Sequence, residues 1–172
     1  MNRIKGLISF ALVFCGVLLV GVAAMHDAEA RDLQGRLGLG YNAQFANQRE
    51  TNGGVPAIAA KYAMTKDIAV EGVVGIATTK PANSVVGMKF FKNLFFENNL
   101  NFYGMIAGGL VTANNESGID LQGGFGTEFF IPGLESVGLS FEVGGELTNL
   151  SGSMVFRTMG ASFLDAGMRF YF

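Results

Sequence analysis

From residue 36 onward, apolar side chains alternate with small or polar ones along most of the chain. The clearest example lies in 136–144, where Leu139, Phe141 and Val143 alternate with serine, glutamate and glycine. Because successive side chains of a β-strand point to opposite faces, this period of two predicts strands with one apolar face. Eight strands are expected, over 36–45, 57–64, 68–76, 86–90, 100–110, 119–129, 136–144 and 164–172.

The segments between these strands predict connections that alternate in length. Short turns are expected after the second, fourth and sixth strands, at 65–67, 92–98 and 132–133. Longer loops are expected at 47–54, 79–83, 112–117 and 148–154. This order puts both chain ends on one side, as in outer-membrane barrels with short periplasmic turns and longer external loops.

The apolar faces of the strands could point outward to lipid or inward, as in a soluble barrel of the lipocalin kind. The lumen of an eight-stranded barrel is barely wide enough for its own side chains, so this many bulky groups cannot fit inside. The other face is mostly glycine, alanine and serine, whereas a water-facing surface is normally richer in lysine and glutamate. The pattern therefore predicts an all-β fold, an eight-stranded antiparallel transmembrane up-and-down β-barrel.

The start of the chain has the order of a secretory signal peptide. A basic beginning precedes the apolar run 7–22, and Ala28 and Ala30 are the small residues before an expected cleavage at Arg31. An uncleaved N-terminal anchor is the alternative, because the run is at the long end for a signal peptide. The 172 residues are thus expected to comprise a signal peptide, 1–30, and one barrel domain, 31–172.

Charge and composition exclude several kinds of chemistry. A net charge of −2 without a basic cluster argues against nucleic-acid binding. The only cysteine, Cys15, and the only histidine, His26, lie in the expected leader, so the mature chain would lack disulfides, Cys or His metal ligands and a histidine base. No cofactor and no metal is expected, since carboxylates near Asp120 could bind a metal but have no loop motif behind them.

The last strand carries a specific motif made of Asp165, Gly167, Phe170 and Phe172. It resembles the C-terminal signal by which bacterial outer-membrane barrels are recognised for insertion, a polar residue, then Gly, then two aromatic or apolar residues two positions apart. With the strand rhythm, the glycine-rich inward faces and the inward charges, residues 36–172 resemble the small eight-stranded outer-membrane barrels of the OmpA and OmpX type. The resemblance implies a monomer in the bacterial outer membrane, surrounded by its lipids and inserted by the barrel-assembly machinery.

Charged side chains on the predicted inward face form the only candidate site. They are Arg36, Lys61, Glu71, Lys89, Asp120, Glu128, Glu142, Glu146, Asp165 and Arg169. Because an unpaired buried charge costs several kcal/mol, we expect an ion-pair network that fills the lumen, with a gated ion pathway through the same pairs as the alternative. The turn at 65–67 sets Lys61 opposite Glu71, which predicts an ion pair between them.

These features predict a non-catalytic outer-membrane barrel with a structural or surface-interaction role. A narrow channel for ions or small solutes is the second hypothesis, and a lipid-modifying barrel enzyme is a distant third. Barrels of that third kind use a histidine in proton transfer, and the expected mature chain has none.

Overall fold

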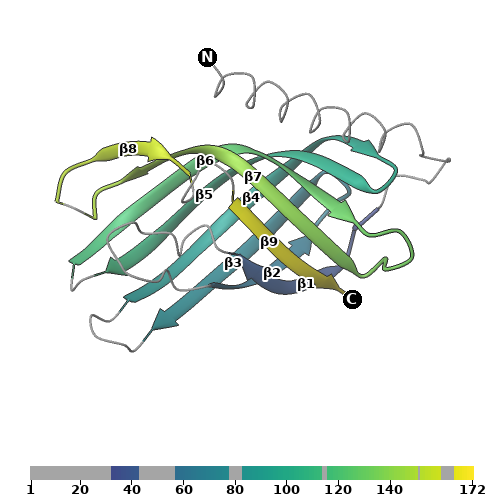
Figure 1. Ribbon diagram of the computed structural model, residues 1–172, viewed down its shortest axis with the longest axis horizontal. Helices are drawn as coiled ribbons and strands as arrows, with labels where there is room; N and C mark the ends of the chain where they lie inside the picture. The colour runs from purple at the N-terminus through teal and green to yellow at the C-terminus, as the bar shows by residue number, and fades with distance from the viewer. Residues whose placement is uncertain (1–31, 43–56, 78–82, 114–115, 151, 160–164) are drawn as a thin grey trace, which may run out of the picture.

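The computed structural model describes residues 32–42, 57–77, 83–113, 116–150, 152–159 and 165–172. These residues form a closed antiparallel β-barrel, in which the first strand pairs with the last (Figure 1). The signal peptide expected over 1–30 lies outside the described residues. In the part of the chain that is described, no helix is long and apolar enough to cross a membrane.

The described residues contain nine strand segments. They are β1 Leu37–Asn42, β2 Ala57–Ala63, β3 Ile68–Ala77, β4 Asn83–Glu97, β5 Leu100–Ala113, β6 Glu116–Phe130, β7 Val137–Thr148, β8 Val155–Thr158 and β9 Asp165–Tyr171. Both β8 and β9 pair with β7, β8 along 145–148 and β9 along 137–142, so together they fill one position of the ring. The prediction of an eight-stranded antiparallel barrel is confirmed. The alternation of apolar and polar residues did not reveal β8, which shares the eighth position of the ring with β9.

The turn between β2 and β3 is held by a threonine side chain. Thr65 Oγ1 accepts hydrogen bonds from the backbone nitrogens of Asp67 and Ile68, at 3.2 and 3.0 Å. A hydroxyl that bonds the backbone two and three residues ahead stabilises a tight turn. The turn sets Lys61 opposite Glu71, so the predicted register of this hairpin is confirmed.

The connection between β4 and β5 differs from its prediction. β4 continues to Glu97 and the chain reverses at 98–99, so the apolar turn expected over 92–98 is wrong. The pairing shifts register between Asn93 and Phe95, and the Phe95 ring stacks on Phe102 of β5 with centroids 4.7 Å apart. Because aromatic pairs across strands stabilise a sheet, the apolar segment is held in the strand and not in a turn.

The loop expected over 112–117 is also wrong, because β5 and β6 remain paired as far as Ala113 and Glu116. The connections therefore do not alternate in length along the whole chain. The turn predicted at 132–133 is confirmed, and Gly133 has a φ of 83°, a conformation that costs glycine nothing. Of the other loops, the one predicted at 148–154 follows β7, but it leads into β8 and not, as predicted, directly into the terminal strand. The loops predicted at 47–54 and, for the most part, at 79–83 lie outside the described residues.

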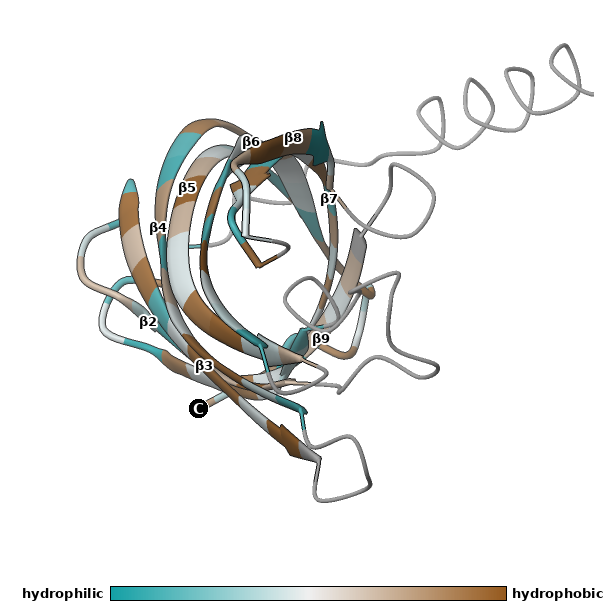
Figure 2. Ribbon diagram, turned by 90° about the vertical axis from the view of Figure 1, so that its left-hand side faces the viewer, coloured by the Kyte–Doolittle hydropathy of each residue, from teal (hydrophilic) through white to brown (hydrophobic). Residues whose placement is uncertain are grey.

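Apolar side chains cover the outer face of the barrel, and charged side chains lie inside it. Ile58 and Ile106 on the outer face are 73% and 65% exposed, whereas Glu71 and Arg169 are 0% exposed. Figure 2 shows the underlying alternation of hydrophobic and hydrophilic residues along the strands. For the described residues the predicted orientation is confirmed, and the alternative with an apolar lumen is wrong.

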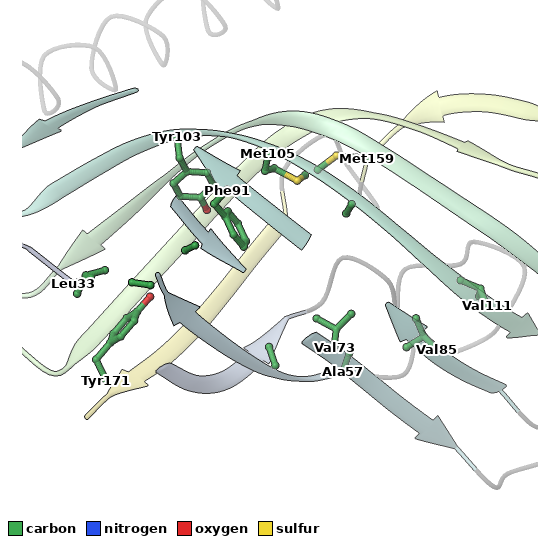
Figure 3. Packing of buried hydrophobic residues seen from close by; sticks show 14 of the residues in the cluster. Leu33, Ala57, Val73, Val85, Phe91, Tyr103, Met105, Val111, Met159 and Tyr171 are labelled. Carbon is green, nitrogen blue, oxygen red and sulfur yellow. The ribbon is translucent and has the colours of Figure 1, made fainter. Parts of the chain in front are cut away.

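Aromatic side chains are among the buried residues of the interior, and Figure 3 shows Phe91, Tyr103 and Tyr171 there. Phe91 of β4 and Tyr103 of β5 meet edge to face, with centroids 5.1 Å apart. This packing leaves no room for a side chain at Gly126 of β6, where a Cβ would lie 2.7 Å from the Tyr103 ring and 2.8 Å from Glu142 Cγ. Glycine at this position is required by close packing inside the barrel.

Replacement of Gly126 by alanine is expected to lower the free energy of unfolding by about 1–3 kcal/mol, the usual cost of overpacking. The matched control is Gly72→Ala in β3, because a Cβ there meets no atom within 4 Å. The control should be neutral or slightly stabilising, since alanine restricts the unfolded chain more than glycine does. Urea unfolding midpoints in detergent micelles measure both variants, and equal losses would contradict the packing argument.

Candidate functional site

Among the described residues, six charged side chains meet inside the barrel and form what we call the inner network. They are Lys61 of β2, Glu71 of β3, Lys89 of β4, Glu128 of β6, Glu142 of β7 and Arg169 of β9, each at most 3% exposed. All occupy inward positions of the strand alternation. Three carboxylates are thus balanced by three cations, so the network is neutral when every member is ionised.

Glu128 is the centre of the inner network. Its Oε2 accepts a hydrogen bond from Lys61 Nζ at 2.7 Å. Its Oε1 accepts hydrogen bonds from the Tyr171 hydroxyl at 2.6 Å and from Arg169 Nη1 at 3.2 Å. Because β2 lies opposite β6 in the ring of eight positions, the bond between Lys61 and Glu128 crosses the lumen.

The other bonds of the inner network also join strands that are not neighbours. Arg169 Nε donates to Glu71 Oε2, which ties β9 to β3. Lys89 Nζ donates to Glu142 Oε2 at 2.5 Å, and the Tyr103 hydroxyl donates to Glu142 Oε1 at 2.8 Å. Charge-assisted hydrogen bonds are stronger than neutral ones, so the network cross-links the walls of the barrel.

The ring of Phe91 lies among the three cations. Lys61 Nζ is 4.5 Å from the ring centroid, Lys89 Nζ is 5.4 Å from it and Arg169 Cζ is 5.9 Å from it. All three distances are within the range of cation–π attraction, which is strongest where water is excluded. The aromatic ring therefore attracts each of the three like charges and offsets part of the repulsion among them.

The predicted ion pair between Lys61 and Glu71 is wrong, although the two residues are opposite each other in register. Lys61 bonds Glu128 across the lumen, and Glu71 bonds Arg169. Neighbouring residues on the wall of a narrow closed barrel point toward its axis, where long side chains meet partners from other strands. Register alone was therefore insufficient to assign partners.

Asp120 and Glu146, which the sequence placed on the inward face, belong to a second group nearer the end where β7 leads into β8. We call it the loop-end cluster, and it also contains Gln122 and Arg157. Gln122 Nε2 donates to Asp120 Oδ2 at 3.0 Å, and Arg157 Nε donates to Glu146 Oε1. This cluster has two carboxylates and one guanidinium, so it carries a net negative charge when ionised.

Two other predicted residues lie apart from both groups. Arg36 is half-buried near the opposite end of the barrel, where its Nη2 donates to the backbone oxygen of Tyr171 at 3.3 Å. Asp165 begins β9 with its backbone opposite Glu142, and its side chain lies outside the described residues.

Sequence reasoning missed four contributors to the interior, Phe91, Tyr103, Tyr171 and Arg157. The three aromatic residues occupy positions of the polar, inward face in their strands. An aromatic residue on that face was the feature of the sequence that could have revealed them. Arg157 lies on β8, directly opposite Glu146. It could have been predicted to lie inside the barrel only if that short strand had been predicted.

The interior supplies ion pairs, hydrogen bonds and aromatic rings. Within the described ranges, no group of three or more His, Cys, Asp or Glu residues is arranged to hold a metal ion. No protein-family model, no curated protein and no solved structure matches this chain. The class that the fold and the site define is a closed eight-stranded antiparallel β-barrel, apolar outside and charged inside.

Lys61→Met and Glu128→Gln are expected to be energetically coupled. Either single variant removes the Lys61–Glu128 bond and leaves the inner network with one uncompensated buried charge, at a cost of about 3 kcal/mol, and the double variant should recover part of that loss. The matched control cycle combines Lys61→Met with Glu71→Gln, the residue opposite in register. Urea midpoints in micelles give both coupling energies, and a larger value for the control would contradict the assigned partners.

Proposed function

We propose that this chain is an integral outer-membrane β-barrel of the OmpA and OmpX type, with a structural or surface-interaction role and no catalytic activity. The observation that carries the proposal is the apolar outer face of a closed barrel whose interior holds ion pairs. An exposed apolar surface of this extent is unfavourable in water, and lipid is the partner that would surround a barrel on all sides.

The strand lengths support a membrane location. A strand needs about 9–11 residues to cross a bilayer at the usual tilt. The strands from β3 to β7 contain between 10 and 15 residues, which is sufficient. We infer export by the leader predicted over 1–30, insertion by the barrel-assembly machinery and a monomeric state, since closure leaves few strand edges for a second copy.

The terminal motif supports the choice of the outer membrane. In β9 and the residue after it, Phe170 and Phe172 point outward and are 45% and 73% exposed, while Arg169 and Tyr171 point inward. The aromatic residues of the motif are thus accessible on the barrel surface, where a receptor or lipid would meet them. The mature chain would also lack a histidine base, which argues against a lipid-modifying enzyme.

Phe172→Ala is expected to reduce the amount of barrel assembled in the outer membrane without reducing synthesis or export. The matched control is Phe141→Ala, an outward aromatic of β7 that is 42% exposed and outside the motif. Folded closed barrels often keep their shape in detergent until heated, so unboiled gel samples report assembly. Equal amounts of the heat-shifted form in both variants would refute the role of the motif.

A narrow channel is the second candidate function, and one observation favours it. Glu71 Oε1 and Arg169 Nη2 are buried and have no hydrogen-bond partner among the described residues. Groups with unused bonding capacity can exchange partners at lower cost than saturated ones. The inner network nevertheless places six charged side chains and the Phe91 ring in the lumen of an eight-stranded barrel, which leaves little space for ions.

Planar-bilayer recordings separate the two candidates. We expect no discrete conductance from the native protein, because the inner network occupies the lumen. The double variant Glu71→Ala with Arg169→Ala removes both charges of a bonded pair. It should produce small, reproducible conductance steps. Discrete steps from the native protein would favour the channel, and silence from both proteins would indicate that other side chains close the lumen.

A further inference from the structure

The loop-end cluster contains more oxygen acceptors than donors. Asp120 Oδ2 accepts from Gln122 Nε2, and Glu146 Oε1 accepts from Arg157 Nε. The remaining oxygens Asp120 Oδ1 and Gln122 Oε1 are both buried and have no hydrogen-bond partner among the described residues. A buried acceptor without a partner costs free energy, so two of them in one cluster indicate a ligand that oxygen atoms can bind, such as a cation.

These oxygens come from one small region of the wall. Asp120 and Gln122 are two residues apart on the inward face of β6, and Gln122 lies directly opposite Glu146 on β7. Their side chains are 1%, 5% and 4% exposed, so bulk water does not satisfy them. Two carboxylates on neighbouring strands repel each other, and the single positive charge of Arg157 is not enough to neutralise both of them.

We propose that the loop-end cluster binds a divalent cation, calcium in preference to magnesium, through Asp120, Glu146 and the amide oxygen of Gln122. Donor sets made only of oxygen select hard cations, and calcium accepts irregular geometry and water ligands more readily than magnesium does. With two carboxylates and one amide, much of the coordination shell is water. The site is therefore weak, with a dissociation constant on the order of 10⁻⁴–10⁻³ M, as in extracellular calcium modules.

The proposal is independent of the membrane location, because it rests only on side chains inside the barrel. Its test is isothermal titration of calcium chloride into the full-length protein, folded in zwitterionic micelles without anionic lipid and at constant ionic strength. Magnesium and sodium chlorides are titrated in parallel. We expect saturable calcium binding to the native protein, weaker binding of magnesium, and no saturable binding of sodium.

Three variants locate the site. Asp120→Asn should weaken calcium binding roughly tenfold or more, since it removes a charged ligand. Arg157→Gln should strengthen binding, because it removes a competing cation from Glu146. The matched control Glu116→Gln removes the same charge from an exposed position on the same strand and should leave the binding unchanged. If Asp120→Asn does not fold, Gln122→Met removes the amide oxygen and should also weaken binding.

Several results would overturn the proposal. Equal effects of calcium and sodium on the native protein would mean that no site exists. Equal losses in Asp120→Asn and Glu116→Gln would indicate general surface electrostatics. Stabilisation of the native protein by mild acid, without any effect of calcium, would show that a proton and not a metal ion satisfies the Asp120 carboxylate.

Discussion

Electrical neutrality inside a narrow closed barrel is the constraint on which the rest of this structure depends. Three carboxylates and three cations lie where bulk water does not reach, and each is at most 3% exposed. Isolated buried charges of this kind cost several kcal/mol each, so every member of the inner network requires the others. The barrel closes because the last strand returns beside the first, and that return brings Arg169 to its partners.

The geometry of the lumen determines how these charges meet. Lys61, Glu71 and Lys89 lie side by side on three neighbouring strands, in an order that would allow pairing along the wall. Lys61 and Lys89 instead bond Glu128 and Glu142 on other strands, and the Phe91 ring lies among the cations. The side chains whose bonds cross-link the walls of the barrel are therefore also the ones that occupy its lumen.

The two ends of the interior differ in charge. The inner network is balanced, whereas the loop-end cluster has two carboxylates for one guanidinium and two buried oxygens without partners. In an outer-membrane barrel this end would face the exterior, where external loops carry recognition. The proposed cation site thus lies at the end of the barrel where the proposed surface role would be performed.

The sequence by itself determined the strands, the two faces and the inward position of the charges, because the period of two is a local property of the backbone. It also determined the register of the β2–β3 hairpin, since a tight turn with Thr65 leaves one alignment. The ion-pair partners, the strand β8 and the length of β4 were decided only by the tertiary structure. Partners inside a closed ring depend on which side chains reach its axis together, and that is settled by the curvature and stagger of all eight positions.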